Sequence, residues 1–174
     1  MSMNIKYKGG FKSISGVLYE INILVDGYVG SETNIAFTNE PLNIEWPDAD
    51  KFEAVRSSNA TVNLYSDSDR QFIDLYTVKP GSIRMDVYRT GILYWSGTLD
   101  PELYEEPYAY KTDYGVKLTF ADFAILDRNK WTATGFITLR AAITMILASS
   151  GINYTEIEEH ISTQHSTYNT EDLL

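Results

Sequence analysis

The chain contains 174 residues, of which 44% are hydrophobic, and it has a formal net charge of −10 and no cysteine. This length fits one ordinary domain, or one domain and part of another, and a domain of this size buries about 70% of its unfolded surface without a disulfide staple. The acidic balance argues against a nucleic-acid partner, and the lack of cysteine excludes disulfides, thiol catalysis and cysteine-bound metal.

The first part of the chain predicts a series of short β-strands. Residues 4–8 predict an edge strand, which Gly9 and Gly10 are expected to end because glycine weakens a strand interior. Apolar and polar residues then alternate in residues 17–26, 41–46 and 59–65, which predicts strands with one buried face. A further short strand is expected over residues 34–37, within a stretch that is otherwise loop-like.

A short helix is expected next, over residues 69–76. Ser68 and Gln71 have the spacing of a capping box, in which the serine caps one backbone N–H and the glutamine reaches back to another. Asp67 and Asp69 could instead bind a hard cation, but the further oxygen ligands and the glycine of a calcium loop are missing. Capping is therefore the preferred interpretation.

A β-hairpin that begins near residue 83 is at the centre of the chain. Apolar residues alternate along its first strand. The turn at residues 89–91 includes Gly91, which can adopt a positive φ. The return strand, residues 92–95, is expected to end before Gly97 and Pro101, since both residue types disfavour continued pairing.

The pattern changes from strands to helices after residue 120. A last alternating strand is predicted over residues 115–120. Asp122 follows it as the candidate N-cap of a short helix. Residues 138–150 carry an apolar stripe at helical spacing and predict one long helix.

These elements give a fold class that is mainly β (α+β). The sequence predicts a small β-barrel or sandwich of roughly seven to nine short antiparallel strands, with a helical segment after residue 120. Residues 1–120 are expected to form the barrel-like domain. Residues 121–174 are expected to form a helical segment and an acidic extension, which is interpreted as the start of a truncated second domain.

Acidic and tyrosine side chains cluster after the hairpin. The members of this cluster are Asp100, Glu102, Tyr104, Glu105, Glu106, Tyr108 and Tyr110. Aromatic rings beside carboxylates suit a sugar-binding platform, a contact surface for a neighbouring subunit or a plain solvated loop. A glycosidase would need two carboxylates on opposite sides of a bond, and clustering in the sequence does not show that arrangement.

The sequence contains no motif that predicts catalysis or a cofactor. The two histidines, His160 and His165, are five residues apart and lack the i, i+4 spacing of a helical zinc site. No G-x-S-x-G nucleophile elbow or glycine-rich phosphate loop is present. We therefore expect no catalytic residue, no metal and no cofactor. Membrane insertion is not expected either, because no apolar run approaches the roughly 18 residues that a span needs.

Three stretches taken together have a familiar order. They are YEINILVDGYVG, PLNIEWPDADKFEAVRSSNATVNLYSDSDRQFIDLYT, and DVYRTGILYWSGTLDPELYEEPY followed by VKLTFADFAILDRNKW. The order resembles the N-terminal part of bacteriophage tail hub proteins, the family that includes baseplate hub and tail-tip proteins, and the resemblance extends over residues 17–152. The family's pattern has its counterparts at Gly91, Trp95, Gly97, Leu99, Thr119, Phe120, Asp122 and Leu126.

The resemblance implies a structural protein of a phage or prophage, without enzymatic activity. Hub domains of this family are similar to small β-barrels that associate, often as trimers, into a ring at the end of the tail tube. The implied partners are copies of the chain itself and other tail or tube proteins. The implied locations are the virion tail and, during assembly, the host cytoplasm.

Large aromatic residues are the usual energetic anchors of such interfaces. The candidate contact residues are Tyr88, Tyr94, Trp95, Tyr104 and Tyr108. The first alternative is a carbohydrate-binding β-sandwich module that uses residues 95–110. A hydrolase that uses the acidic residues 100–106 is the second alternative.

Overall fold

The computed structural model describes residues 2–46, 57–77, 79, 81–100 and 111–122, together with the separate positions 141, 145 and 148. Strands account for 61% of the described residues and form one mixed sheet of eight strands. The prediction of a mainly β fold is therefore confirmed.

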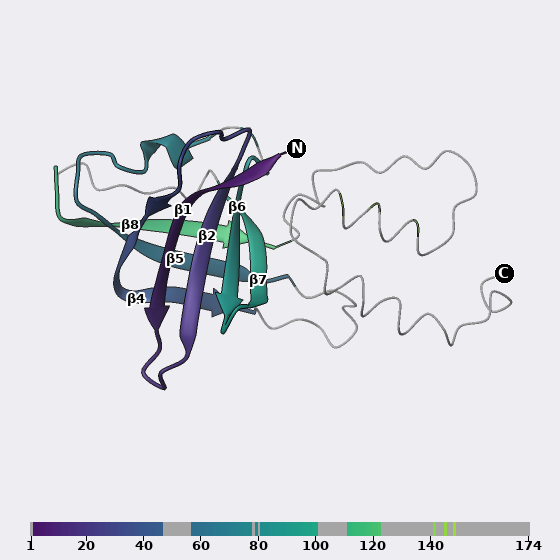
Figure 1. Ribbon diagram of the computed structural model, residues 1–174, viewed down its shortest axis with the longest axis horizontal. Helices are drawn as coiled ribbons and strands as arrows, with labels where there is room; N and C mark the ends of the chain where they lie inside the picture. Colours follow the sequence, from purple (N-terminus) through teal and green to yellow (C-terminus); the bar gives the residue numbers. More distant parts are fainter. Residues whose placement is uncertain are drawn as a thin grey trace, which may run out of the picture.

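The strands are arranged in a sheet whose order differs from their order in the chain. Their bounds are β1 Met3–Lys12, β2 Leu18–Asp26, β3 Thr33–Asn34, β4 Ala36–Glu45, β5 Asn59–Ser66, β6 Ile83–Arg89, β7 Ile92–Leu99 and β8 Tyr114–Ala121. The order in the sheet is β3-β1-β2-β6-β7-β8-β5-β4 (Figure 1). All neighbours are antiparallel except β1 and β3, which are parallel.

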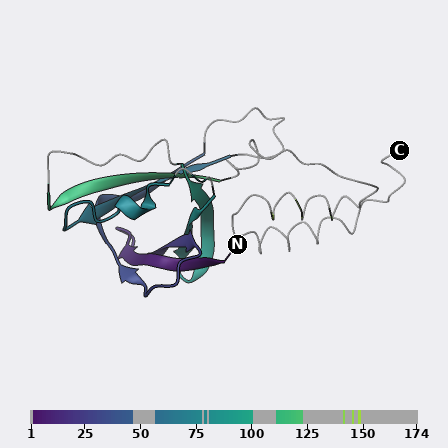
Figure 2. The same cartoon turned by 90° about the horizontal axis from the view of Figure 1, so that it is seen from above.

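The sheet closes on itself because its first and last strands are nearly one stretch of chain. Only Ile35 separates β3 from β4. β3 pairs with β1, and the Ile35 N–H donates to the carbonyl oxygen of Lys8 at 2.8 Å. β4 then pairs with β5 on the other side. The described strands therefore enclose a barrel, which Figure 2 shows from above.

The prediction that Gly9 and Gly10 end the first strand is wrong, because β1 runs through both residues. A Cβ atom added to Gly9 would lie 2.7 Å from the carbonyl oxygen of Ile35 and 2.8 Å from the Phe37 ring. Glycine is needed here because the β3–β4 stretch crosses close over β1 where the barrel closes. The glycine that weakens an isolated strand thus permits the closure of the whole sheet.

The inner faces of the strands form one apolar core. In β2 the predicted buried face is confirmed, since Ile21 and Ile23 have no exposed surface. The same holds for the alternating residues of β5, β6 and β8, whose fully buried members are Val62, Leu64, Met85, Val87, Leu118 and Phe120. Burial of such side chains contributes roughly 1.5–3 kcal/mol each and is the main source of stability.

The 3₁₀ helix η1, Ile73–Leu75, covers one end of the barrel. Phe72 and Leu75 have no exposed surface, and the Phe72 ring meets the ring of Tyr7 edge to face with centroids 5.4 Å apart. The Tyr7 hydroxyl also donates to the Asp74 carboxylate at 2.8 Å. The segment is thus fixed to β1 by apolar packing and by a hydrogen bond.

The predicted capping box is wrong. Arg70 has a φ of 54°, which is left-handed and incompatible with a continuous α-helix, so residues 69–72 form a turn. The N-cap of η1 is Phe72, without a side-chain hydrogen bond. Ser68 accepts a hydrogen bond through its carbonyl oxygen, and the Gln71 side chain accepts one from the Asp67 N–H at 3.1 Å.

The central hairpin is longer than predicted. Thr90 and Gly91 have φ values of 51° and 82°, as a two-residue hairpin turn of type I′ requires. The return strand β7 passes through Gly97 and continues to Leu99. A Cβ at Gly97 would lie 2.3 Å from the Trp95 ring, so this glycine makes room for the indole and does not end the strand.

Most of the predicted helical region lies outside the described residues. Asp122 is described, but the short helix expected after it is not. Of the predicted helix at residues 138–150, the positions 141, 145 and 148 are helical and exposed. The predicted boundary between residues 120 and 121 lies one residue before the end of β8, and most of the predicted second segment lies outside the described residues.

Candidate interaction surface at the hairpin end

Two hairpin turns meet at one end of the barrel. The first joins β1 to β2 over residues 13–17, and the second joins β6 to β7 at Thr90 and Gly91. The Thr90 N–H donates to the carbonyl oxygen of Leu18 at 2.9 Å, which holds the two turns together. We call residues 11–19 and 88–94 the hairpin end; the β1–β2 turn is the lowest part of the barrel in Figure 1.

A β-bulge separates two neighbouring aromatic residues of β7. Val87 pairs with Trp95 and Tyr88 pairs with Leu93, so Tyr94 is an extra residue on this strand. As a result Trp95 faces inward with 6% of its surface exposed, while Tyr94 is 45% exposed. Tyr94 therefore belongs to the surface and Trp95 to the core.

A row of aromatic rings crosses the hairpin end. The Arg89 guanidinium lies 5.8 Å from the centroid of the Tyr94 ring. Centroids are 6.3 Å apart between Tyr94 and Tyr19, and 5.4 Å apart between Tyr19 and the stacked ring of Phe11. The ring of Phe37 continues the row edge to face at 5.6 Å from Phe11. The row forms a stiff apolar platform with a cation at one edge.

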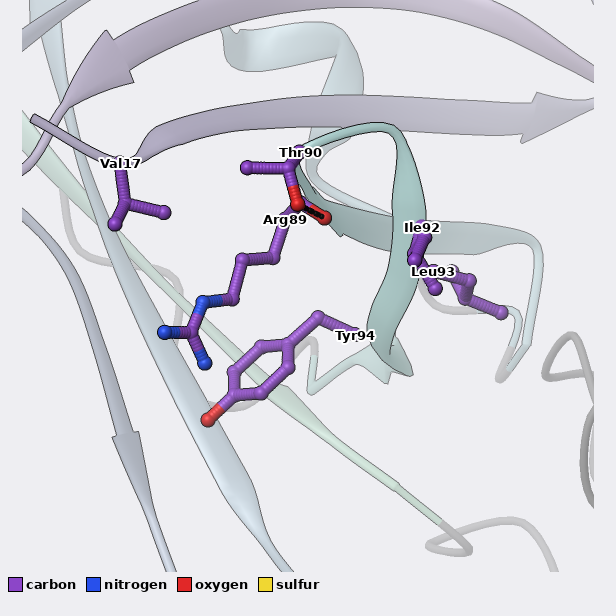
Figure 3. Close-up of a pocket in the computed structure, with 6 residues that line it drawn as sticks. All are labelled: Val17, Arg89, Thr90, Ile92, Leu93 and Tyr94. Atoms are coloured by element: carbon purple, nitrogen blue, oxygen red, sulfur yellow. Dashed lines mark hydrogen bonds between the residues drawn. The ribbon is translucent and has the colours of Figure 1, made fainter.

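A shallow pocket of about 390 Å³ lies at this edge of the row (Figure 3). In Figure 3 the Arg89 side chain extends beside the Tyr94 ring, and Val17 lies on the far side of the pocket. The described residues that line it are Val17, Arg89, Thr90, Ile92, Leu93 and Tyr94. Ile92 is 63% exposed, so the surface around the pocket is apolar and open to contact.

The hairpin end has a charge opposite to that of the chain. Residues 11–19 and 88–94 contain Lys12 and Arg89 and no carboxylate, whereas the whole chain has a net charge of −10. Within the described part of the chain, Arg89 forms no ion pair. An exposed guanidinium on an apolar surface is suited to binding a carboxylate of a partner.

The predicted contact residues have different positions in the structure. Tyr94 is exposed at the hairpin end, as its prediction requires, and Tyr88 is half-buried on the outer side of β6. Burial is the main cause that raises the pKa of the Tyr88 hydroxyl, and nearby Asp86 adds to it. Trp95 is buried and is not a surface residue, so its prediction as a contact residue is wrong. Tyr104 and Tyr108 lie outside the described residues.

Trp95 belongs instead to a group that we call the polar clamp, which consists of Ser58, Trp95 and Asp122. The Trp95 Nε1–H donates to the Ser58 hydroxyl at 2.8 Å. Ser58 donates to the Asp122 carboxylate through its hydroxyl and, at 2.6 Å, through its backbone N–H. The Asp122 N–H returns a bond to the Ser58 carbonyl oxygen at 3.0 Å. The polar clamp ties the start of β5 to the end of β8.

Sequence reasoning missed the polar clamp because its members are far apart in the chain. It assigned Asp122 to a helix N-cap, whereas the carboxylate is bound by Ser58. Burial raises the pKa of the Asp122 carboxyl above its ordinary value, and the hydrogen bonds from Ser58 oppose this shift.

A second polar group lies on the outer side of the central hairpin. Asp86 is 2% exposed and accepts hydrogen bonds from Ser96 at 2.7 Å and from the Arg84 guanidinium at 3.1 Å. These bonds connect β6 to β7 on the side opposite the core. They stabilise the hairpin that carries Arg89 and Tyr94 at its tip.

Other predicted sites are not assembled in the described part of the chain. No group of three His, Asp or Glu side chains that could hold a metal occurs there, and Asp67 and Asp69 do not form one. His160, His165 and the carboxylates of residues 102–106 lie outside the described residues. The described ranges also contain no helix that is long and apolar enough to cross a membrane.

No protein-family model, curated protein or solved structure matches the chain. The hairpin end combines exposed apolar side chains, a stiff aromatic row and an unpaired cation, and these features are typical of a protein contact surface.

Proposed function

We propose that the chain is a structural component of a phage or prophage tail hub or baseplate, which assembles through protein–protein contacts. The observation that carries this proposal is the hairpin end, where Ile92 and Tyr94 are exposed around Arg89 on a closed barrel. Aromatic and arginine side chains dominate the energetics of protein interfaces. The proposed partners are copies of the chain and other tail or tube proteins, in the virion tail and in the host cytoplasm during assembly.

The shape of the barrel supports a mechanical role. Its interior is filled by side chains, and Ile21, Met85 and Leu118 at its centre have no exposed surface. Because the sheet closes on itself, the barrel presents a stiff surface, which keeps the entropic cost of docking low. A rigid body with exposed apolar side chains at its hairpin end is suited to repeated assembly.

The pocket at the hairpin end offers little for catalysis. General acid–base catalysis needs a titratable group poised near the operating pH, and nucleophilic catalysis needs an activated nucleophile beside a base. Among the described residues that line the pocket, Arg89 is the only charged one. A guanidinium binds anions through its N–H donors but is not a general acid–base catalyst. We therefore keep the proposal of a non-enzymatic protein.

The carbohydrate-binding alternative depended on an exposed ring of Trp95, and this ring is buried. A sugar needs an open ring face for stacking, and Trp95 is 6% exposed with its Nε1–H bound to Ser58. The other aromatic residues of that hypothesis, Tyr104 and Tyr108, lie outside the described residues. No described feature favours this alternative over assembly.

The proposal is tested by the absolute mass of the full chain in solution, measured by light scattering over a range of concentrations. We expect an oligomer of at least three chains, each of 19.7 kDa, that dissociates on dilution. Electron microscopy of the same sample is expected to show closed rings. A mass of one chain at every concentration would contradict the proposed self-assembly.

A further inference from the structure

We infer that copies of the chain associate head to tail, with the hairpin end of one copy docked against the opposite end of the next. We call residues 27–32 and 66–76, which surround η1 and the loop after β2, the η1 end. The inference rests on the proposed self-assembly and deepens it, because it names the two surfaces that meet. It makes the partner of the hairpin end a second copy of this chain.

The two surfaces lie at opposite ends of the barrel. β2 starts beside the hairpin turns at Leu18 and ends at Asp26, where the loop of residues 27–32 begins. Helix η1 lies at the upper left of the barrel in Figure 1, and the β1–β2 turn lies at the bottom. A contact between unlike ends joins copies in one direction, and such contacts produce either closed rings or open filaments.

The η1 end exposes apolar side chains, as the hairpin end does. Val29 is 96% exposed and Ile73 is 48% exposed. The loop under Val29 has a defined shape, since the Tyr28 hydroxyl donates to the Ser31 carbonyl oxygen at 2.7 Å. Val29 thus protrudes from one end of the barrel, and the other end has an apolar pocket of about 390 Å³.

The charges of the two ends are complementary. Two carboxylates of the η1 end are bound within the copy, Asp74 by Lys6 and Glu32 by Lys8. Two others, Asp67 and Asp69, form no ion pair with a described residue; Arg70 lies beside them and forms none either. Residues 11–19 and 88–94 contain two exposed cations and no carboxylate, and the exposed Glu20 follows this range on β2, opposite Tyr88.

Charge also excludes the symmetric arrangements. Two hairpin ends that meet across a twofold axis would bring Arg89 and Lys12 of both copies together, and like charges in an interface cost several kcal/mol. Two η1 ends that meet would oppose the carboxylates of Asp67 and Asp69. Of the three ways in which these two ends can meet, contact between unlike ends is the one that gives Arg89 a carboxylate partner on a surface with the same apolar character.

The test reverses the charges at each end and then at both. We expect Arg89→Glu to weaken self-association by roughly 30-fold or more, and Asp67→Lys with Asp69→Lys to do the same. The chain that carries all three substitutions has complementary ends again, and it is expected to recover most of the affinity. Sedimentation equilibrium of the full chain measures each dissociation constant.

The matched control is Lys117→Glu, which has the same charge change as Arg89→Glu on an exposed position of β8 away from both ends. Its affinity is expected to equal that of the parent chain, and circular dichroism checks that all variants fold. If the parent assembles and Arg89→Glu does not weaken it, the head-to-tail inference is overturned while the proposed function stands. If the triple variant folds but gains nothing over the single variants, the pairing of these two ends is also overturned. A parent that never assembles contradicts both proposals.

Discussion

Asp122 shows how burial and hydrogen bonding compete at a single carboxyl group. Its folded-state pKa lies above the ordinary value of 3.8, since burial outweighs the bonds from Ser58. An acid whose pKa is raised on folding contributes stability that is complete below the unfolded-state pKa and is lost as the pH rises through the folded-state pKa. Ionised Asp122, the form present at neutral pH, therefore stabilises the folded state less than protonated Asp122 does.

Asp122→Asn removes this titration and keeps an oxygen that can accept from the Ser58 N–H. We expect its free energy of unfolding at pH 7 to lie within about 1 kcal/mol of the parent value. As the pH falls from 7 toward 4, the parent is expected to gain stability relative to this variant. Urea titrations at several pH values measure the difference.

Asp113→Asn is the matched control, because Asp113 is exposed at the surface and hydrogen-bonded to Tyr65. Asparagine also tolerates its φ of 63°. Comparison with this control separates the effect of the buried Asp122 carboxyl from that of an Asp-to-Asn change in general. A parent-to-Asp122→Asn difference that stays constant over the same range would contradict the account of the polar clamp.

At the scale of elements, η1 is a short helix that is held by its buried side chains. Three residues in a 3₁₀ turn have little intrinsic stability. Phe72 and Leu75, however, are completely buried in the end of the barrel. Packing therefore determines the position of η1, and with it the position of the exposed Ile73.

Phe72→Ala tests this dependence. Removal of a fully buried phenylalanine leaves a cavity, and we expect a loss of about 3–5 kcal/mol in the free energy of unfolding. Ile73→Ala changes the adjacent residue, which is 48% exposed, and is expected to cost less than about 1 kcal/mol. Urea denaturation measures the free energy of unfolding of both variants, and equal losses of stability would refute the assigned packing of Phe72.

The strands could be predicted from the sequence because each buries one face. Alternation identified the cores of β2, β5, β6 and β8, where a shift of one residue would exchange core and surface. Glycine was misread in β1 and β7, since its role at Gly9 and Gly97 depends on groups that approach from elsewhere in the fold. The capping box failed at Arg70, whose left-handed backbone has no signature in the sequence.

The candidate site was predicted only in part, because its geometry also depends on residues that are distant from one another in the sequence. Aromatic content indicated a contact surface, and Tyr94 is on it. The sequence could not show that the bulge sends Tyr94 outward and Trp95 inward, because a bulge is a property of the paired strands. The closeness of the two hairpin turns and the unpaired state of Arg89 depend on the pairing of β2 with β6, which is a long-range contact.

At the scale of the whole molecule, closure of the barrel depends on a very short stretch of strand pairing. β3 pairs with β1 at only two positions, Tyr7 with Thr33 and Lys8 with Asn34. The approach of Ile35 and Phe37 to Gly9 completes the closure. The stability of the barrel is therefore expected to be sensitive to any added volume at Gly9.

Gly9→Ala is expected to destabilise the barrel by about 1–3 kcal/mol, because the added methyl group meets backbone and ring atoms that are already packed. Gly115→Ala is the control, since its Cβ would lie 3.4 Å from the Thr38 side chain, which is ordinary van der Waals contact. The free energy of unfolding of Gly115→Ala is expected to lie within about 0.5 kcal/mol of the parent value. Thermal and urea unfolding measure both, and an unchanged stability of Gly9→Ala would contradict the tight closure.

Because of the bulge in β7, one surface residue of this strand can be gained or lost without a change in the core. Side chains alternate between faces, so loss of one codon in a regular strand turns every later residue to the wrong side. Tyr94 is the exception, because it is the extra residue of the bulge and has no counterpart on β6. Its deletion would leave the two-residue turn and the inward register of Trp95 in place. A lineage could therefore gain or lose the exposed ring in one step, without redesign of the barrel beneath it.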